Sequence, residues 1–183
     1  MTRPTPPGYT SRLPKTISSA LDTPERVLEY CRTHNLTTDY DAVNIEEIIN
    51  SDDALTLIYE DLGEKDAYIK CNSANDFTIG IHKFHHKNRQ RFSMAHEYGH
   101  YQLHRNNIKT IKEGEKILHR DGVVKAVERQ ANNFAADILM PRLSVERAMR
   151  DAGENMTEAA RRLQVSVAAL DYRLINLGMR NGR

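Results

Sequence analysis

The chain has 183 residues, of which 39% are hydrophobic and 28% charged, with a formal net charge of +1 at pH 7. This composition is typical of one soluble globular domain, and so balanced a charge gives no bulk electrostatic reason to expect a nucleic acid or a membrane as partner. No stretch is apolar enough for a secretory signal or a membrane span, and Cys31 and Cys71 alone do not form a disulfide framework, so we expect a cytoplasmic protein.

The N-terminal segment differs in composition from the rest. Residues 1–18 contain four of the six prolines, together with small polar residues and few apolar ones. This composition predicts a disordered arm, because it offers too little apolar surface to pack. We expect residues 19–183 to form a single domain, with residues 141–183 as its C-terminal helical part.

Two short helices are expected next. Thr23, Pro24 and Glu25 form the sequence of a helix start, with an N-cap, a proline in the first turn and an early acid. The helix should run to about Thr33. A second helix is expected at about residues 43–49, where isoleucines recur with helical spacing.

Between residues 54 and 82 the pattern changes to short apolar runs separated by turn-rich segments, namely LTLIYE, AYIKC and FTIGI. This pattern predicts a three-stranded antiparallel sheet. An extended peptide could add to an edge of such a sheet and be held across a metal site on the helix that follows. The alternative is that the sheet serves only as the packing partner of the following helix.

Three histidines, His82, His85 and His86, lie between the last predicted strand and the next helix. They could form a second metal site, or one imidazole could stabilise an oxyanion. Because no neighbouring carboxylate or thiol completes a ligand set, we favour a solvated basic turn that leads into the helix.

The sequence RFSMAHEYGHYQLH, residues 91–104, contains the pattern HExxH. Its apolar positions recur with helical spacing, so His96 and His100 should project from one face of a helix and reach the same metal ion. Glu97 lies at the edge of that face, where its carboxylate can take a proton from a water molecule beside the metal. Two structural histidines without a metal would also satisfy the pattern, so a third ligand is needed.

His104 continues the four-residue spacing and invites a three-histidine site. On an unbroken helix it lies ~12 Å from His96 along the axis, at ~1.5 Å per residue, whereas each Zn–N bond is only ~2.1 Å long. No glycine or proline between His100 and His104 breaks the helix. We therefore expect His104 near the helix end or beside a ligand histidine, not on the metal.

The sequence VVKAVERQANNFAADILM, residues 123–140, has a helical apolar stripe that stops before Pro141, and the polar residues 106–122 before it should form a loop that could contain one short helix. Glu128 adjoins the stripe, where a carboxylate is costly unless it is paired or ligated. Glu128 is therefore the candidate third metal ligand, with a solvated surface acid as the alternative. Asn132, one turn on, can hydrogen-bond a ligand histidine and orient it.

Together these two segments resemble the ImmA/IrrE family of zinc metallopeptidases. In that family arginine-phenylalanine precedes the HExxH helix, and a helix with glutamate-x-x-alanine-asparagine ends in methionine-proline. The resemblance covers about residues 55–141, and two motifs in the right order are far more specific than HExxH alone. Tyr98 departs from the usual aliphatic residue or phenylalanine, a change that leaves the ligands untouched.

The resemblance implies both a fold and a site. The fold would be an α+β, zincin-like peptidase domain with a small antiparallel three-stranded sheet, the HExxH helix, a second ligand helix and a C-terminal helical region. The site would be gluzincin-like, with Zn²⁺ as cofactor bound by His96, His100 and Glu128. Glu97 would act as the general base of peptide-bond hydrolysis.

The resemblance also implies a substrate. The known substrates of the family are helix-turn-helix repressors of phage, mobile-element or stress-response operons, cut to release transcription, and some members belong to toxin-antitoxin-like pairs. No separate N-terminal DNA-binding domain is apparent in this sequence. We therefore expect the repressor to be a second protein, encoded nearby.

Residues 157–177 predict a helix, a short turn at Val165 and Ser166, and a second helix, the shape of a helix-turn-helix DNA reader. However, residues 141–183 hold eight arginines and five acids, and the resemblance implies that such helices belong to the peptidase domain. We favour recognition of a protein substrate by this region. The alternative is a non-catalytic regulator that binds a partner protein or DNA through these helices, although the intact Glu97 argues against lost catalysis.

Overall fold

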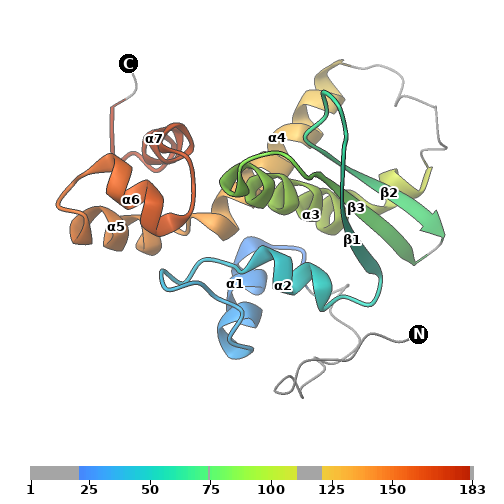
Figure 1. Ribbon diagram of the computed structural model, residues 1–183, viewed down its shortest axis with the longest axis horizontal. Helices are drawn as coiled ribbons and strands as arrows, with labels where there is room; N and C mark the ends of the chain where they lie inside the picture. Colours follow the sequence, from blue (N-terminus) through green and yellow to red (C-terminus); the bar gives the residue numbers. More distant parts are fainter. Residues whose placement is uncertain (1–20, 74, 111–120, 182–183) are drawn as a thin grey trace.

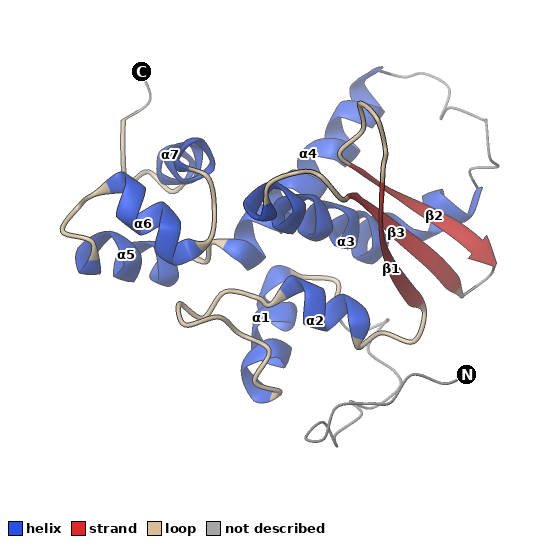
Figure 2. Ribbon diagram, viewed as in Figure 1, coloured by secondary structure: helices blue, strands red, loops and turns tan. Residues whose placement is uncertain are grey.

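The computed structural model describes residues 21–73, 75–110 and 121–181. The expected disordered arm at residues 1–18 lies outside these ranges, as do residues 111–120 of the expected loop. Within the described ranges the elements are, in order, α1 (Pro24–Thr33), α2 (Ile45–Asn50), β1 (Leu55–Glu60), β2 (Ala67–Ser73), β3 (Asp76–His82), α3 (Lys87–Thr110), α4 (Asp121–Leu139), α5 (Arg142–Asp151), α6 (Met156–Leu163) and α7 (Val167–Asn176). Figure 1 shows α3 and α4 between the sheet and the group α5–α7, and Figure 2 shows that helices make up most of the molecule.

The predicted helices are present, and some of their ends are shifted. α1 has the expected bounds, and its N-cap Thr23 accepts a hydrogen bond from the Arg26 amide at 3.4 Å. α2 starts later than expected, because Val43 pairs with Thr37 in an isolated bridge. α3 extends to Thr110, so the prediction of a loop is wrong for the first residues of that segment. None of the helices in the described ranges has the length and hydropathy that crossing a membrane requires.

The sheet is mixed, so the prediction of an antiparallel sheet is wrong for β1. The strand order is β1-β3-β2: β2 runs antiparallel to β3, whereas β1 runs parallel to it, with Leu55 opposite Phe77. β3 is buried from Phe77 to His82 and therefore needs a hydrogen-bonding neighbour on each side. β2 occupies one side through the local hairpin, β1 takes the other, and the segment through β2 supplies the crossover that a parallel pair requires.

α3 and α4 pack against each other at very short range. A Cβ atom on Gly99 would lie 3.2 Å from the carbonyl oxygen of Ala131 and 3.3 Å from its Cα atom. Both residues are fully or almost fully buried, and the ring of Phe134 closes the same contact at 3.4 Å. Because Gly99 has no side chain, the two backbones can approach closely enough for side chains of α4 to reach the histidines of α3.

Arg91, at the start of the HExxH segment, is a buried structural residue. Its Nη1 donates to the carbonyl oxygens of Leu163 at 2.8 Å and Gln164 at 3.2 Å, and its Nη2 donates to that of Val43 at 3.2 Å. Burial lowers the pKa of the guanidinium from 12.5 to about 10. Arg91 thus ties α3 both to the end of α6 and to the segment before α2.

The C-terminal region contains the predicted helix, turn and helix. α6 ends at Leu163, and its C-cap Gln164 has a left-handed φ of 56°. Ser166 caps α7 by accepting a hydrogen bond from the Ala169 amide at 3.1 Å. The buried side chains of Leu163 and Leu170 hold the two helices together. α6 and α7 are therefore two packed helices joined by a short turn.

Candidate metal centre

Three side chains from α3 and α4 gather around one point. The Nε2 atoms of His96 and His100 lie 3.0 Å apart. The carboxylate of Glu128 completes a triangle, with Oε2 3.3 Å from His96 Nε2 and Oε1 3.4 Å from His100 Nε2. In the part of the chain that the structure describes, this is the one group of histidine, cysteine and acidic side chains whose ligand atoms all lie within 4.8 Å of one another.

The donor set fits zinc in chemistry and in size. A tetrahedral zinc ion with bonds of ~2.0–2.1 Å holds neighbouring ligand atoms roughly 3.3 Å apart, close to all three sides of the triangle. Two imidazole lone pairs that face each other also repel unless a proton or a cation lies between them. Two neutral imidazoles and one carboxylate are therefore well suited to hold a divalent cation.

Hydrogen bonds at the Nδ1 atoms of His96 and His100 orient both imidazoles. The Oδ1 atom of Asn132 lies 2.9 Å from His96 Nδ1, and an amide oxygen can only accept, so Nδ1 carries the proton. His100 Nδ1 lies 3.2 Å from His104 Nδ1, and His104 Nε2 lies 3.0 Å from the Oε1 atom of Gln130. Gln130 thus fixes the proton of His104, which in turn accepts from His100. Both candidate ligand histidines are left with a free Nε2 lone pair that points into the triangle.

His104 lies beside His100, and their Nδ1 atoms are 3.2 Å apart. The expectation of an unbroken helix is wrong, because His104 itself has non-helical angles, with φ of −125° and ψ of 18°, where α3 bends. Gln130 was not foreseen, since an exposed glutamine on a helix carries no sequence signal of this role.

Glu97 lies buried beside the triangle, with 8% of its surface exposed. Burial raises the pKa of its carboxyl to about 8, and the negative charge of Glu128 is the second cause. A divalent cation held at the triangle would oppose this rise. Burial, followed by the charge of His96, lowers the pKa of His100 to about 4, which keeps the imidazole in the neutral form that binds metals.

The second histidine cluster has a structural role. His82 is buried, so the expected solvated turn is wrong for this residue: its Nε2 donates to the carbonyl oxygen of Gly63 at 3.1 Å and its Nδ1 accepts from the Phe84 amide at 3.2 Å. The ring of His85 stacks on it at 4.2 Å, and His86 accepts a backbone hydrogen bond at the start of α3. In the loop after β1, Asp66 lies 3.3 Å from the His85 ring and Asp61 lies 3.8 Å from the His82 ring, but these side chains do not form a group of metal ligands.

Comparison with known proteins identifies the class to which this fold and site belong. The chain belongs to the peptidase M78 family, because the family model described as IrrE N-terminal-like domain matches residues 52–175. This confirms the expected relationship to ImmA/IrrE metallopeptidases and the expected α+β fold. Membership of a metallopeptidase family implies a metal ion.

One curated protein and one solved structure are similar to most of the chain. Metallopeptidase ImmA of Bacillus subtilis (strain 168) is 25% identical over 170 residues, which are 92% of this chain and 93% of that protein. A solved structure, a Mycobacterium tuberculosis transcriptional regulator, is similar with a TM-score of 0.62 and 14% identity over 83% of this chain. The match covers 46% of the regulator, so this chain spans less than half of its length, and the likeness concerns the fold alone.

We expect His104→Ala to weaken zinc binding without abolishing it. The substitution removes the acceptor that holds the proton on His100 Nδ1, and losses of this kind lower metal affinity about 10- to 100-fold. Competition with a chromogenic chelator measures the affinity. Leu103→Ala, at an exposed neighbouring position, is the control and should bind zinc like the unaltered protein. Equal affinities for the two variants would show that His104 does not orient the ligand.

Proposed function

We propose that this chain is a zinc-dependent endopeptidase in which His96, His100 and Glu128 bind the metal and Glu97 is the general base. The observation that carries this proposal is the triangle of two Nε2 atoms and one carboxylate, with sides of 3.0, 3.3 and 3.4 Å, next to a buried carboxyl group. The family adds support, since its members include a protein named as a metallopeptidase.

Each of these side chains has a distinct task in peptide hydrolysis. Zinc, when bound, supplies a Lewis acid that polarises the scissile carbonyl group and lowers the pKa of water toward ~7. Glu97 takes a proton from the attacking water and delivers it to the nitrogen of the leaving amine as the C–N bond breaks. Asn132 and His104 hold the ligand imidazoles in position.

The sheet offers a place for an extended substrate. β1 and β2 are the outer strands of the three, and an outer strand has unpaired backbone groups that another chain can use. β2 packs against α3, the helix that carries the histidines. We therefore infer that a substrate segment pairs with β2 as an additional strand. A bond inside a stable helix cannot adopt this conformation, so cleavage must fall in a linker or in a helix that opens locally.

We further propose that the substrate is a helix-turn-helix repressor encoded near this protein, whose cleavage releases a phage, mobile-element, stress-response or toxin-antitoxin-like operon. The support is the family resemblance of the paired motifs, together with a C-terminal region whose arginines form ion pairs within the protein. Arg161 and Arg162 pair with Glu158, and Arg173 pairs with Asp137. Arginines that are paired in this way are less available to the phosphates of DNA.

Incubation of zinc-loaded protein with the neighbouring repressor is expected to yield two fragments, which mass spectrometry detects and assigns to one cut. A chelator should abolish the cut and added zinc should restore it. The alternative, a non-catalytic regulator that binds DNA through residues 157–177, predicts intact repressor at confirmed zinc occupancy and salt-sensitive binding of this protein alone to operator DNA.

A further inference from the structure

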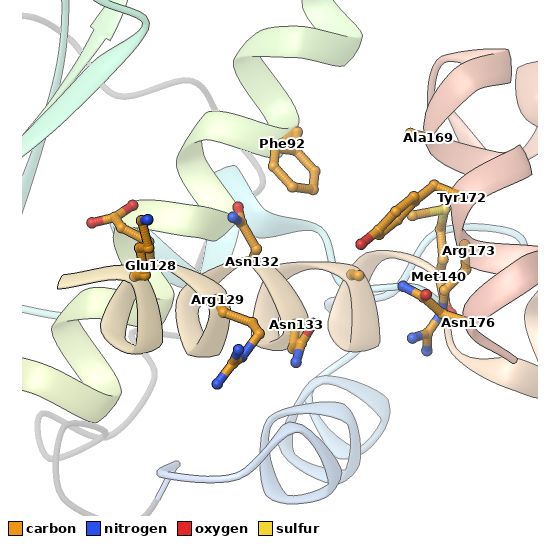
Figure 3. A pocket seen from close by; sticks show the side chains of 12 residues that line it. Phe92, Glu128, Arg129, Asn132, Asn133, Met140, Ala169, Tyr172, Arg173 and Asn176 are labelled. Carbon is orange, nitrogen blue, oxygen red and sulfur yellow. The ribbon is translucent and has the colours of Figure 1, made fainter. Parts of the chain in front are cut away.

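A cavity of about 560 Å³ opens beside the candidate metal centre, between α3, α4 and α7. Glu128 and Asn132 lie at one end of it, and α7 forms the other end (Figure 3). Glu128 is part of the metal-binding triangle, and Asn132 accepts the hydrogen bond from His96. The cavity is therefore continuous with the candidate catalytic site.

Part of the wall of this cavity is apolar, and polar or charged side chains of α4 and α7 line the rest. Figure 3 shows the rings of Phe92 on α3 and Tyr172 on α7 on opposite sides of the space above α4. Ala136 of α4 and Met140, directly after this helix, also line the cavity, and the small side chain of Ala169 leaves room next to Tyr172. Tyr172 is 68% exposed, an unusual degree for an aromatic ring beside a cavity. The apolar part of the wall favours a large aliphatic or aromatic side chain over a polar one.

One face of α7 lines this cavity. α7 corresponds to the reader helix of a helix-turn-helix unit, yet Ala169, Tyr172 and Asn176, spaced on one helical face, line the cavity. The neighbouring Arg173 is engaged inside the protein, since its Nε donates to the carbonyl oxygen of Met140 at 2.9 Å. This face of α7 therefore looks toward the metal centre and carries an aromatic ring at the cavity.

We propose that this cavity binds a large apolar side chain of the substrate, such as leucine, methionine or phenylalanine, close to the bond that is cut. Ala169 and Tyr172 set the size and shape that the cavity accepts, so the C-terminal helices select the cleavage site. The inference rests on the proposed function, because the cavity acquires this meaning through Glu128 at the metal centre.

Small hydroxamates provide a direct test, because the hydroxamate group binds the zinc ion and the side chain then reports on the cavity. The compounds are N-acetylglycine hydroxamate and N-acetylleucine hydroxamate, titrated calorimetrically into zinc-loaded protein. We expect the leucine compound to bind roughly 10- to 100-fold more tightly than the glycine compound, as burial of a leucine side chain predicts. The difference between the two compounds is independent of turnover.

Two variants change the cavity, and a third is the matched control. Ala169→Trp fills the cavity and should abolish the preference for the leucine compound. Tyr172→Ala removes one wall at an exposed position, where folding tolerates the change, and should reduce the preference. Ala168→Trp makes the same substitution as the first variant one position earlier, on an exposed site outside the cavity, and should keep the preference. Circular dichroism checks the fold of each variant.

The outcomes separate this inference from the proposed function. If the glycine compound binds but the leucine compound binds no more tightly, the cavity is not a side-chain site, whereas the zinc centre stands. If Ala168→Trp loses the preference as fully as Ala169→Trp, the cavity again does not explain it, and the inference is overturned. If neither compound binds protein of confirmed zinc content, the accessible metal centre and the role of the cavity both fail.

Discussion

Replacement of Glu97 by glutamine is expected to lower peptide-bond hydrolysis by about 10²- to 10⁴-fold, the range over which general acid-base groups contribute. Glutamine has nearly the same shape and can still hydrogen-bond, but it cannot accept the proton of the attacking water. The side chain is buried at 8% exposure and is not one of the three candidate ligands, so zinc content should be unchanged. Initial rates of repressor cleavage, with zinc content measured on the same samples, test this expectation.

A matched substitution distinguishes the base from a general effect of lost charge. Glu25→Gln removes an exposed carboxylate from the first turn of α1 and should leave both rate and zinc content unaltered. Full hydrolytic activity in Glu97→Gln would remove Glu97 from the chemistry. Unaltered release of transcription in cells by this variant would show that cleavage is not the biological function, and would favour the binding regulator.

Loss of Glu128 is expected to remove most of the bound metal. Protein purified with zinc should carry close to one ion per chain, and Glu128→Ala removes the single carboxylate of a site with three protein ligands. His96→Ala or His100→Ala should have a similar effect, since each opens the triangle on one side. Atomic absorption after dialysis against a weak chelator measures the content. Full zinc content in Glu128→Ala would refute the assignment of the third ligand.

The control for this series is an acid outside the site. Glu146→Ala removes a carboxylate of α5 that pairs with Arg142, and it should leave zinc content unchanged. A drop in this variant equal to that in Glu128→Ala would indicate general unfolding in place of a lost ligand. Thermal unfolding of each variant in the presence of excess chelator separates the two explanations.

Local patterns in the sequence were sufficient for most of the secondary structure. The helix around His96 and His100 follows from spacing within one turn, and the start of α1 follows from Thr23 and Pro24. The pairing of strands could not be predicted in the same way. Three short apolar runs fit a meander equally well, and only the complete burial of β3 from Phe77 to His82 requires a neighbour on both sides.

The candidate site shows the same limit. Glu128 was chosen because a carboxylate at the edge of an apolar stripe needs a partner, yet its distance from the histidines depends on the close contact of α3 with α4 at Gly99. No glycine or proline between His100 and His104 predicts the bend of α3 at His104. The cavity beside Phe92 lies between α3, α4 and α7, and no periodicity within one helix predicts it.

Arg91 has a consequence for how the molecule assembles. The carbonyl oxygens that it binds on Leu163 and Gln164 follow it by 72 and 73 positions in the chain. Contacts of such sequence separation slow folding, because a long loop must close before they form. As the chain leaves the ribosome, the helix with the histidines emerges well before two of the acceptors of Arg91. A nascent fragment that ends before α6 therefore lacks two of the three carbonyl oxygens that hold this guanidinium in the complete protein.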